Sequence, residues 1–166
     1  MVTCALAARK SGQAPTSHEY DIMCKGGGAL GFDRPSRIER WGVATNEEIK
    51  SAVDEKGLVW LDVRTPEEVA RRPFPTGKAF VVKACKVTMF STKDLEEQAP
   101  KLIPSKAAPI LVFCSGGGRA EEARKALKKL GYAGTITNGG MPEDIEEAVP
   151  DVLKAAATTK GRCIIS

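Results

Sequence analysis

The chain has 166 residues, enough for one domain with a sizeable hydrophobic core, and its 42% of hydrophobic residues is ordinary for a globular protein. Its net charge is a mild +4 with acidic and basic residues interspersed, and only 5% of its residues are aromatic, so no nucleic-acid partner is expected. No apolar run approaches the length of a transmembrane helix.

Cysteine usage points to a reducing compartment. The five cysteines are odd in number and widely spaced, they form no Cys-x-x-Cys pair, and His18 is the single histidine of the sequence. We therefore expect a cytoplasmic protein with no metal site and no cofactor. The five are Cys4, Cys24, Cys85, Cys114 and Cys163.

The first forty residues are rich in small and basic residues and show little hydrophobic periodicity. We interpret residues 1–40 as a poorly ordered N-terminal extension. Because the first acidic residue is Glu19, an organelle-targeting peptide is the alternative, but its amphipathic arginine pattern is not evident and no secretory signal is visible. The folded domain is expected over residues 41–153, followed by a tail at 154–166.

Strand and helix patterns alternate through the expected domain. Residues 41–44 predict a short strand, and the capping box Thr45-Asn46-Glu47-Glu48 begins a helix that runs to about residue 55. Leu58–Val63 is an almost continuous apolar run, typical of a strand covered on both faces. A second capping box, Thr65–Glu68, has proline at the first helical position and predicts a short helix.

The alternation continues downstream. Strands are expected at 79–82, 110–113 and 134–137, a short extended piece at 87–90, and helices at 92–102, 119–130 and 142–157. Strands that alternate with helices indicate an α/β fold with an open parallel sheet and helices on both faces.

One cysteine lies where a strand, a glycine loop and a helix meet. Cys114 follows the apolar run Ile110–Phe113, Ser115–Gly118 holds three consecutive glycines, and a helical pattern begins at Arg119. Such a loop can turn its N–H groups inward, and the helix N-terminus and Arg119 add positive charge, so we expect a thiol of lowered pKa that is largely thiolate. The same cradle would hold an anion or a negatively charged sulfur adduct.

Two plainer interpretations compete with a reactive cysteine. A cysteine after an apolar strand is often a small buried hydrophobe, and a glycine loop before a helix can bind phosphate without covalent chemistry. The phosphate-binding Gly-Lys-Ser/Thr pattern and the dinucleotide Gly-x-Gly-x-x-Gly pattern are both absent from the loop.

Three segments resemble the rhodanese family. Cys114-Ser115-Gly116-Gly117-Gly118-Arg119, opening a helix, is similar to the six-residue active-site loop of that family. Val59–Glu68 resembles its other recurrent segment, and Gly131-Tyr132 with Ile136 and Asn138-Gly139-Gly140 resembles its next strand and glycine turn. The resemblance covers about residues 41–149.

The resemblance implies a single-domain sulfurtransferase. Cys114 would be the catalytic nucleophile, taking a sulfane sulfur from a donor such as thiosulfate and passing it from a persulfide to cyanide or a thiol. The loop would bind the substrate and stabilise the persulfide, and its last residue would also hold the loop's shape. The expected substrate-binding residues are Ser115, Gly116, Gly117, Gly118 and Arg119. Because the second loop position is often basic in thiosulfate users and is Ser115 here, mercaptopyruvate or protein persulfides remain open as donors.

Asp62 and Arg64 end the second expected strand, on the side where open α/β sheets keep their sites. The resemblance implies that Asp62 helps hold the active-site side of the sheet. From the residues alone we favour a structural role, with Asp62 tying backbone N–H groups and Arg64 pairing with Glu67 or Glu68.

Two other features differ from a simple family pattern. Relatives usually carry Gly-His-Ile-Pro-Gly-Ala where this chain has residues 71–79, so we expect a rebuilt loop without the histidine. Cys85 could resolve a persulfide, but an ordinary, partly buried cysteine is the favoured interpretation.

The last four residues, Cys163-Ile164-Ile165-Ser166, match a prenylation signal, and the terminal serine favours farnesyl. With Lys160 and Arg162 upstream, a farnesyl group on Cys163 would give reversible membrane association. The signal would function only in a eukaryotic host.

Two rival functions stay open, as does the oligomeric state. Cysteine phosphatases and arsenate reductases use Cys-x5-Arg, one residue longer than the Cys-x4-Arg found here, because a tetrahedral oxyanion needs a wider cradle than one sulfur atom. A noncatalytic, prenylated regulatory module on the same fold is the other alternative.

Overall fold

The computed structural model describes residues 33–74 and 82–151. Within them, four parallel strands form one sheet in the order β2-β1-β3-β4. The strands are β1 (Val59–Asp62), β2 (Val82–Ala84), β3 (Ile110–Phe113) and β4 (Ile136–Asn138). The predicted open parallel sheet is confirmed.

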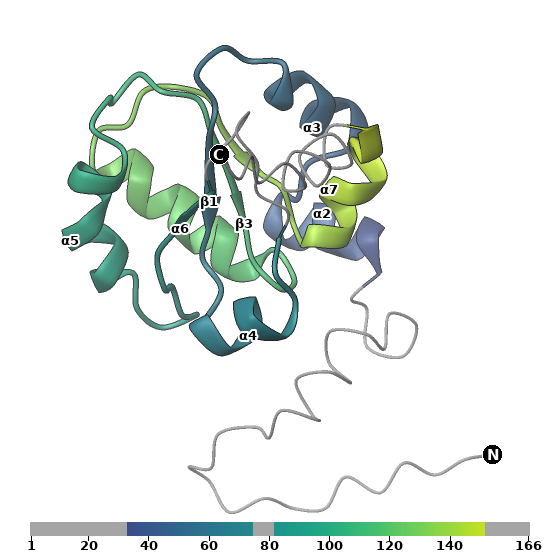
Figure 1. Ribbon diagram of the computed structural model, residues 1–166, viewed down its shortest axis with the longest axis horizontal. Coiled ribbons are helices and arrows are strands. Elements are labelled where there is room, and N and C mark those ends of the chain that lie inside the picture. Colours follow the sequence, from purple (N-terminus) through teal and green to yellow (C-terminus); the bar gives the residue numbers. More distant parts are fainter. Residues whose placement is uncertain (1–32, 75–81, 152–166) are drawn as a thin grey trace, which may run out of the picture.

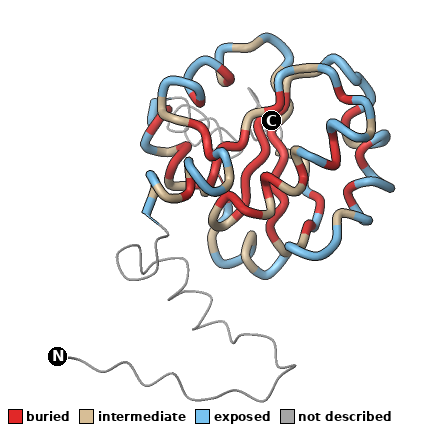
Figure 2. Tube along the Cα trace, turned by 180° about the vertical axis from the view of Figure 1, so that it is seen from behind, coloured by how far each residue is buried: buried red, intermediate tan, exposed pale blue. Residues whose placement is uncertain are grey.

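Helices cover both faces of the sheet, as predicted. On one face lie α5 (Lys93–Leu102) and α6 (Gly118–Lys129), and on the other lie α3 (Asn46–Val53) and α7 (Pro142–Ala148), while α4 (Pro66–Arg71) lies at the carboxyl end of β1 (Figure 1). The two central strands, β1 and β3, run through the buried middle of the domain (Figure 2). Each face therefore has its own hydrophobic core.

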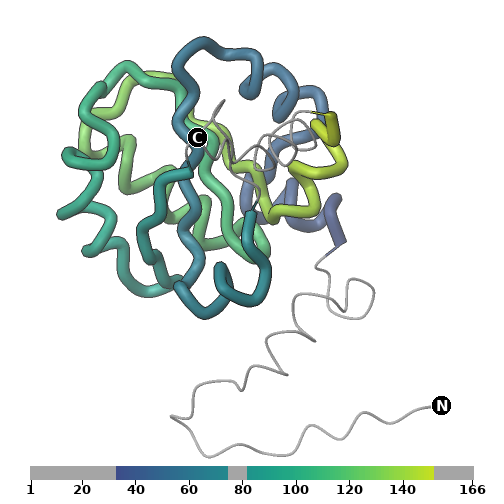
Figure 3. Tube along the Cα trace, in the orientation of Figure 1, coloured from purple at the N-terminus to yellow at the C-terminus, as the bar shows by residue number. Residues whose placement is uncertain are grey.

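The strand register places the carboxyl ends of the strands side by side. Asp62, the last residue of β1, lies opposite Ala84 of β2 and Phe113 of β3. Figure 3 shows the segments that follow β1, β2 and β3 meeting at this end of the sheet. Cys114, the residue after β3, is thus placed where parallel sheets carry their sites.

Both predicted capping boxes are present. The hydroxyl of Thr45 accepts from the N–H of Glu48, whose carboxylate accepts from the N–H of Thr45, at 3.2 and 2.8 Å. Thr65 and Glu68 repeat the arrangement at the start of α4. These reciprocal bonds satisfy two N–H groups that each helix start leaves without a partner.

The folded domain begins earlier than Trp41, where the sequence placed its start. Helix α2 (Arg34–Trp41) precedes it, and the left-handed Gly42 (φ +59°) ends this helix. The patterning missed it because its inward side chain is charged: Arg37 is buried and donates to both oxygens of Asp144. The predicted N-terminal extension, residues 1–40, therefore includes residues at its C-terminal end that belong to α2.

Several predicted boundaries also differ. Residues 41–44 form no strand, although the N–H of Ala44 donates to the carbonyl of Asn138 at 2.8 Å. Residues 87–90 form no strand, and the chain bends at Met89 and Phe90. Strand β4 begins two residues later than expected, and α7 ends at Ala148 because Val149 (φ −135°) leaves the helical conformation.

Some predictions fall outside the described residues. They concern residues 1–32, the segment 75–81 with most of the rebuilt loop, and the tail from 152 onward, which includes Cys163. Prenylation of Cys163 and the membrane association that it would bring stay predictions. Among the helices of the described ranges, none has the length and apolar character needed to cross a membrane.

The pair between α2 and α7 yields the first testable expectation. Replacing Arg37 by alanine leaves the buried carboxylate of Asp144 without its main partner, so Arg37→Ala should lower the free energy of unfolding by about 3 kcal/mol. Urea unfolding of the two proteins measures this difference. The exposed Arg40 on the same helix provides the control, since Arg40→Ala should leave stability unchanged. Equal stability of both variants and the wild type would show that α2 is not part of the cooperative unit.

Candidate active site

Backbone contacts fix the position of Cys114. It follows β3 directly, and its N–H donates to the carbonyl of Gly140 at 2.9 Å. The residue is only 1% exposed and belongs to the core on the α5–α6 face of the sheet. Its position is therefore set by the glycine turn after β4 as well as by β3 itself.

Two backbone N–H groups point at the Cys114 sulfur. The N–H of Gly117 lies 3.0 Å from Sγ and that of Gly116 lies 3.4 Å from it. Gly117 is also the N-cap of α6, so the partial positive end of this helix faces the same sulfur. The loop thus forms a ring of donors suited to negative charge on sulfur.

Gly117 makes this ring sterically possible. Its φ of +101° lies in the left-handed region, and a Cβ there would sit 2.5 Å from Cγ2 of Val43. Both observations exclude a side chain at this position. Gly116 is different, because its φ is not positive and a Cβ there would meet no atom within 4 Å.

Asn138, at the end of β4, fastens the loop to its surroundings. Its buried amide nitrogen donates to the carbonyls of Trp41 and Gly117, at 2.9 and 3.0 Å. Its carbonyl oxygen accepts from the N–H of Gly140 at 3.0 Å. One side chain therefore joins the nucleophile loop, the end of α2 and the turn that holds the Cys114 backbone.

Arg119 closes the loop from the other side. Its guanidinium donates to both oxygens of Glu68 on α4, at 2.8 and 2.7 Å, and to the hydroxyl of Ser115 at 2.6 Å. This geometry matches the expected role of Arg119 in holding the loop's shape. It also ties the last and second residues of the loop to α4.

The pKa of the Glu68 carboxyl reflects this network. Burial acts to raise it, but hydrogen bonds from Arg119 and from the N–H of Thr65, and the charge of Arg119, outweigh burial and hold the pKa at about 2. Glu68 therefore stays a carboxylate in the neutral range and keeps Arg119 in place.

Asp62 and Arg64 form a buried pair next to the loop. Arg64 donates to Asp62 through Nε and Nη2, the latter at 2.7 Å, and through its backbone N–H at 3.0 Å. Asp62 thus ties a backbone N–H, as expected, but Arg64 pairs with Asp62 and not with Glu67 or Glu68, because Arg119 occupies Glu68. The Arg64 guanidinium also lies 5.9 Å from the ring centre of Phe113. The pair supports the carboxyl ends of β1 and β3.

Cys85 is 4% exposed and lies in the same core as Cys114. Burial, and to a lesser extent the charge of Asp94, raises the pKa of the Cys85 thiol. A thiol kept protonated by its surroundings is a poor nucleophile. The geometry therefore agrees with the favoured reading of Cys85 as a packing residue.

The cradle is more closed than the sequence suggests. The Cβ position of Gly118 lies 3.2 Å from the sulfur of Met89 and 3.4 Å from Cε2 of Trp41, so these side chains cover the start of α6. Ser115 and Gly116 keep intermediate exposure and form the more open side of the loop. A pattern of glycines indicates room for a turn, but distant residues decide how far the turn is covered.

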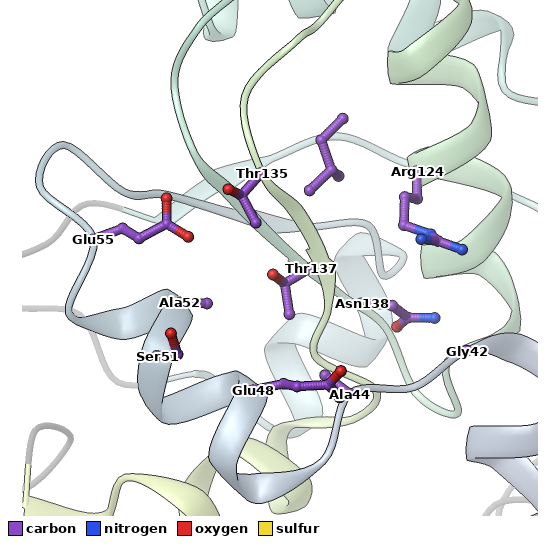
Figure 4. Close-up of a pocket in the computed structure, with 11 residues that line it drawn as sticks. Gly42, Ala44, Glu48, Ser51, Ala52, Glu55, Arg124, Thr135, Thr137 and Asn138 are labelled. Carbon is purple, nitrogen blue, oxygen red and sulfur yellow. The ribbon is translucent and has the colours of Figure 1, made fainter.

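A cavity of about 280 Å³ lies elsewhere, against β4 between α3 and α6 (Figure 4). Glu48 and Ser51 of α3 line one side together with Glu55, which follows the helix. Arg124 of α6 lies across from them, and no residue of the Cys114–Arg119 loop lines the cavity. We place the candidate site at Cys114, because a nucleophile and its donors meet there. Within residues 33–74 and 82–151, no group of three or more His, Cys, Asp or Glu side chains could hold a metal.

The sequence predicts the loop but not the residues that hold it in place. The sequence predicts Asn138 only as part of a glycine turn. The signal for its role is a polar residue that ends a strand immediately before Gly-Gly. Glu68 is predicted as the last residue of a capping box and as a possible partner of Arg64, not of Arg119, and Val43 is predicted only as part of a short strand. The contacts of all three with the loop join residues 21 to 74 positions apart, which spacing along the chain does not reveal.

The chain is similar to known proteins of one family. A model of the rhodanese-like domain matches residues 45–147. Thiosulfate sulfurtransferase PspE of Escherichia coli K12 is 25% identical over 84 residues, which is 51% of this chain and 71% of that protein. Among solved structures, a rhodanese with anions from E. coli is 24% identical, with a TM-score of 0.35 over 52% of this chain and 89% of the other. A homodimeric polysulfide-sulfur transferase from Wolinella succinogenes is 19% identical, with a TM-score of 0.48 over 78% and 83%.

Gly117 and Gly116 form a matched pair for mutation. Gly117→Ala should lower the free energy of unfolding by about 1–3 kcal/mol, because the new Cβ requires a strained φ and overlaps Val43. Gly116→Ala, which meets neither obstacle, should be close to the wild type. Thermal unfolding of the three proteins checks this. Equal losses at both positions would mean that the loop does not have the described conformation.

Glu68 predicts a pH dependence of stability. Because its pKa falls from 4.5 to about 2 on folding, its contribution is fully present above pH 4.5 and is lost as the pH falls through about 2. At pH 7 Glu68→Gln should be less stable than the wild type by about 1 kcal/mol, allowing for partial solvent screening of the pair. Urea unfolding between pH 7 and pH 2.5 should show this difference shrinking. A difference independent of pH would contradict the assigned role of the charge.

Proposed function

We propose that this chain, which belongs to the rhodanese-like domain family, is a sulfurtransferase in which Cys114 carries sulfane sulfur as a persulfide. The observation that carries the proposal is the pair of N–H groups, from Gly116 and Gly117, directed at the Cys114 sulfur. A core cysteine that serves only as a hydrophobe has no need of them. A sulfur that alternates between thiolate and persulfide anion does, because both forms carry negative charge beside the helix start.

The cycle has two balanced steps. In the first, the Cys114 thiolate attacks the outer sulfur of a donor such as thiosulfate, a new S–S bond forms, and the donor's S–S bond breaks with sulfite leaving on the electron pair. In the second, cyanide or a thiolate attacks the terminal sulfur of the Cys114 persulfide. The Cys114 S–S bond then breaks, thiocyanate or an acceptor persulfide leaves, and the Cys114 thiolate returns.

The loop residues have distinct roles in this cycle. The N–H groups of the glycines stabilise the terminal sulfur, and Arg119, anchored on Glu68, keeps the loop in the shape that directs them. Ser115 accepts a hydrogen bond from Arg119 and so joins that anchor. Asp62 and Arg64 act indirectly, because their pair fixes the strand ends that precede and adjoin the loop.

The donor is proposed by class only. The relative from E. coli is named a thiosulfate sulfurtransferase, which makes thiosulfate the first donor to test. Ser115 supplies no positive charge at the second loop position, so mercaptopyruvate and protein persulfides are equally consistent with the loop.

One observation favours a noncatalytic binding module as the second candidate. Cys114 is 1% exposed, and a nucleophile must be reached by its substrate. We favour the enzyme because the loop's open side, Ser115 and Gly116, adjoins the sulfur. A phosphatase remains the weaker enzyme rival, since four residues between Cys114 and Arg119 form a smaller ring than the five used for an oxyanion.

Intact-mass measurement after thiosulfate treatment tests the proposal. The protein should gain about 32 Da, one sulfur atom, and lose it again on addition of cyanide. Cys114→Ser should gain nothing while remaining folded. The buried Cys85 supplies the matched control, because Cys85→Ser should still gain the sulfur.

Other outcomes decide between the candidates. No mass gain with thiosulfate, mercaptopyruvate or a polysulfide would overturn the enzyme and leave the binding module. Hydrolysis of an aryl phosphate that depends on Cys114, without a mass gain, would favour the phosphatase.

A further inference from the structure

Two large hydrophobic side chains are exposed beside the nucleophile loop. Phe90 is 99% exposed and Met89 is 51% exposed. They stand out in the part of the chain that the structure describes, where other large hydrophobic side chains are more covered. We call them the Met89–Phe90 tip. Leaving a phenylalanine in water forgoes the stabilisation that burial would bring, so its exposure needs an explanation.

The tip is presented by a hydrogen-bonded turn. The N–H of Thr88 donates to the carbonyl of Ser91 at 3.1 Å, and the N–H of Phe90 donates to the Thr88 hydroxyl at 3.3 Å. Just before the turn, buried Val87 donates its N–H to the carbonyl of Val63 at 3.3 Å. The turn is thus anchored to the sheet, and it holds Phe90 outward instead of folding it back onto the core.

The tip borders the candidate site. The Met89 sulfur packs against Gly118, with 3.2 Å to the position of a Cβ there, and Gly118 is four residues after Cys114. The neighbouring Gly117 carries the N–H that points at the Cys114 sulfur. Phe90 follows Met89 directly, so a polypeptide that enters on the open side of the loop, at Ser115 and Gly116, and extends as far as Gly118 would reach the tip.

We propose that the physiological sulfur acceptor is a polypeptide whose cysteine is flanked by apolar residues, and that these residues rest on the Met89–Phe90 tip. This inference rests on the proposed sulfurtransferase function and names its substrate class. Cyanide and other small anions have no apolar surface to place on Phe90. A peptide side chain beside the reacting cysteine does, and covering Phe90 would hold the acceptor thiol against the nearly buried Cys114.

A membrane surface is the competing partner for an exposed aromatic tip. Lys86 and Lys93, both exposed, flank the turn and would suit anionic lipid. The contact of Met89 with Gly118 favours the peptide, because it couples the tip to the nucleophile loop, and a lipid-binding tip has no need of that position.

Two synthetic thiol peptides test the proposal as sulfur acceptors. In acetyl-Gly-Gly-Cys-Phe-Leu-amide the cysteine is followed by apolar residues, and in acetyl-Gly-Gly-Cys-Gly-Gly-amide it is not. With the persulfide-loaded full chain, kcat/KM for the apolar peptide should be about tenfold or more above that for the glycine peptide. In Phe90→Ser this ratio should fall toward one. Lys129→Ser, at the far end of α6, is the control and should keep the wild-type ratio.

Each result decides the proposal. Equal use of the two peptides by the wild type, or a preference that survives Phe90→Ser, overturns it. Binding to vesicles of phosphatidylcholine and phosphatidylserine that is lost in Phe90→Ser, together with equal use of the peptides, assigns the tip to a membrane. Transfer to cyanide with no peptide preference overturns this inference alone, whereas no persulfide on Cys114 at all overturns the proposed function beneath it.

Discussion

The hydrogen bond from the Gly117 N–H to the Cys114 sulfur is the constraint on which the site depends. It requires a left-handed φ at Gly117, the absence of a side chain there, and a helix that starts at the next residue. Each requirement serves the same end, which is to direct positive dipoles at one sulfur atom. The proposed chemistry follows, since a thiolate and a persulfide anion both gain from such donors.

Supports from four parts of the chain hold that bond in place. Glu68 anchors the far end of the loop through Arg119, and Asn138 holds the Gly117 carbonyl. The Gly140 turn holds the Cys114 backbone, and Asp144, paired with Arg37, accepts from the N–H of the next residue in that turn, at position 141. Helix α2 therefore helps to support the site, although it contacts no reacting atom. The same arrangement covers Cys114 and leaves Met89 at its border.

The sheet, its helices and the loop could be predicted from local patterns, because capping boxes, apolar runs and glycines act over a few residues. Helix α2 could not, since its buried side chain is Arg37, whose partner lies 107 residues away. The roles of Glu68 and Asn138 were hidden for the same reason. The predicted pairing of Arg64 with Glu67 or Glu68 is wrong. In the folded chain Arg119 binds Glu68 and Arg64 binds Asp62, and the sequence alone does not show which arginine lies near which carboxylate.

Amide NMR shifts on conversion of Cys114 to its persulfide test the central claim most directly. If the loop N–H groups hold the terminal sulfur, the largest ¹H and ¹⁵N changes should fall on Gly116 and Gly117, with smaller changes toward the start of α6. The N–H resonance of Gly57, an exposed residue far from the loop in sequence, should not move. A persulfide that forms while the two loop amides keep their shifts would contradict the account.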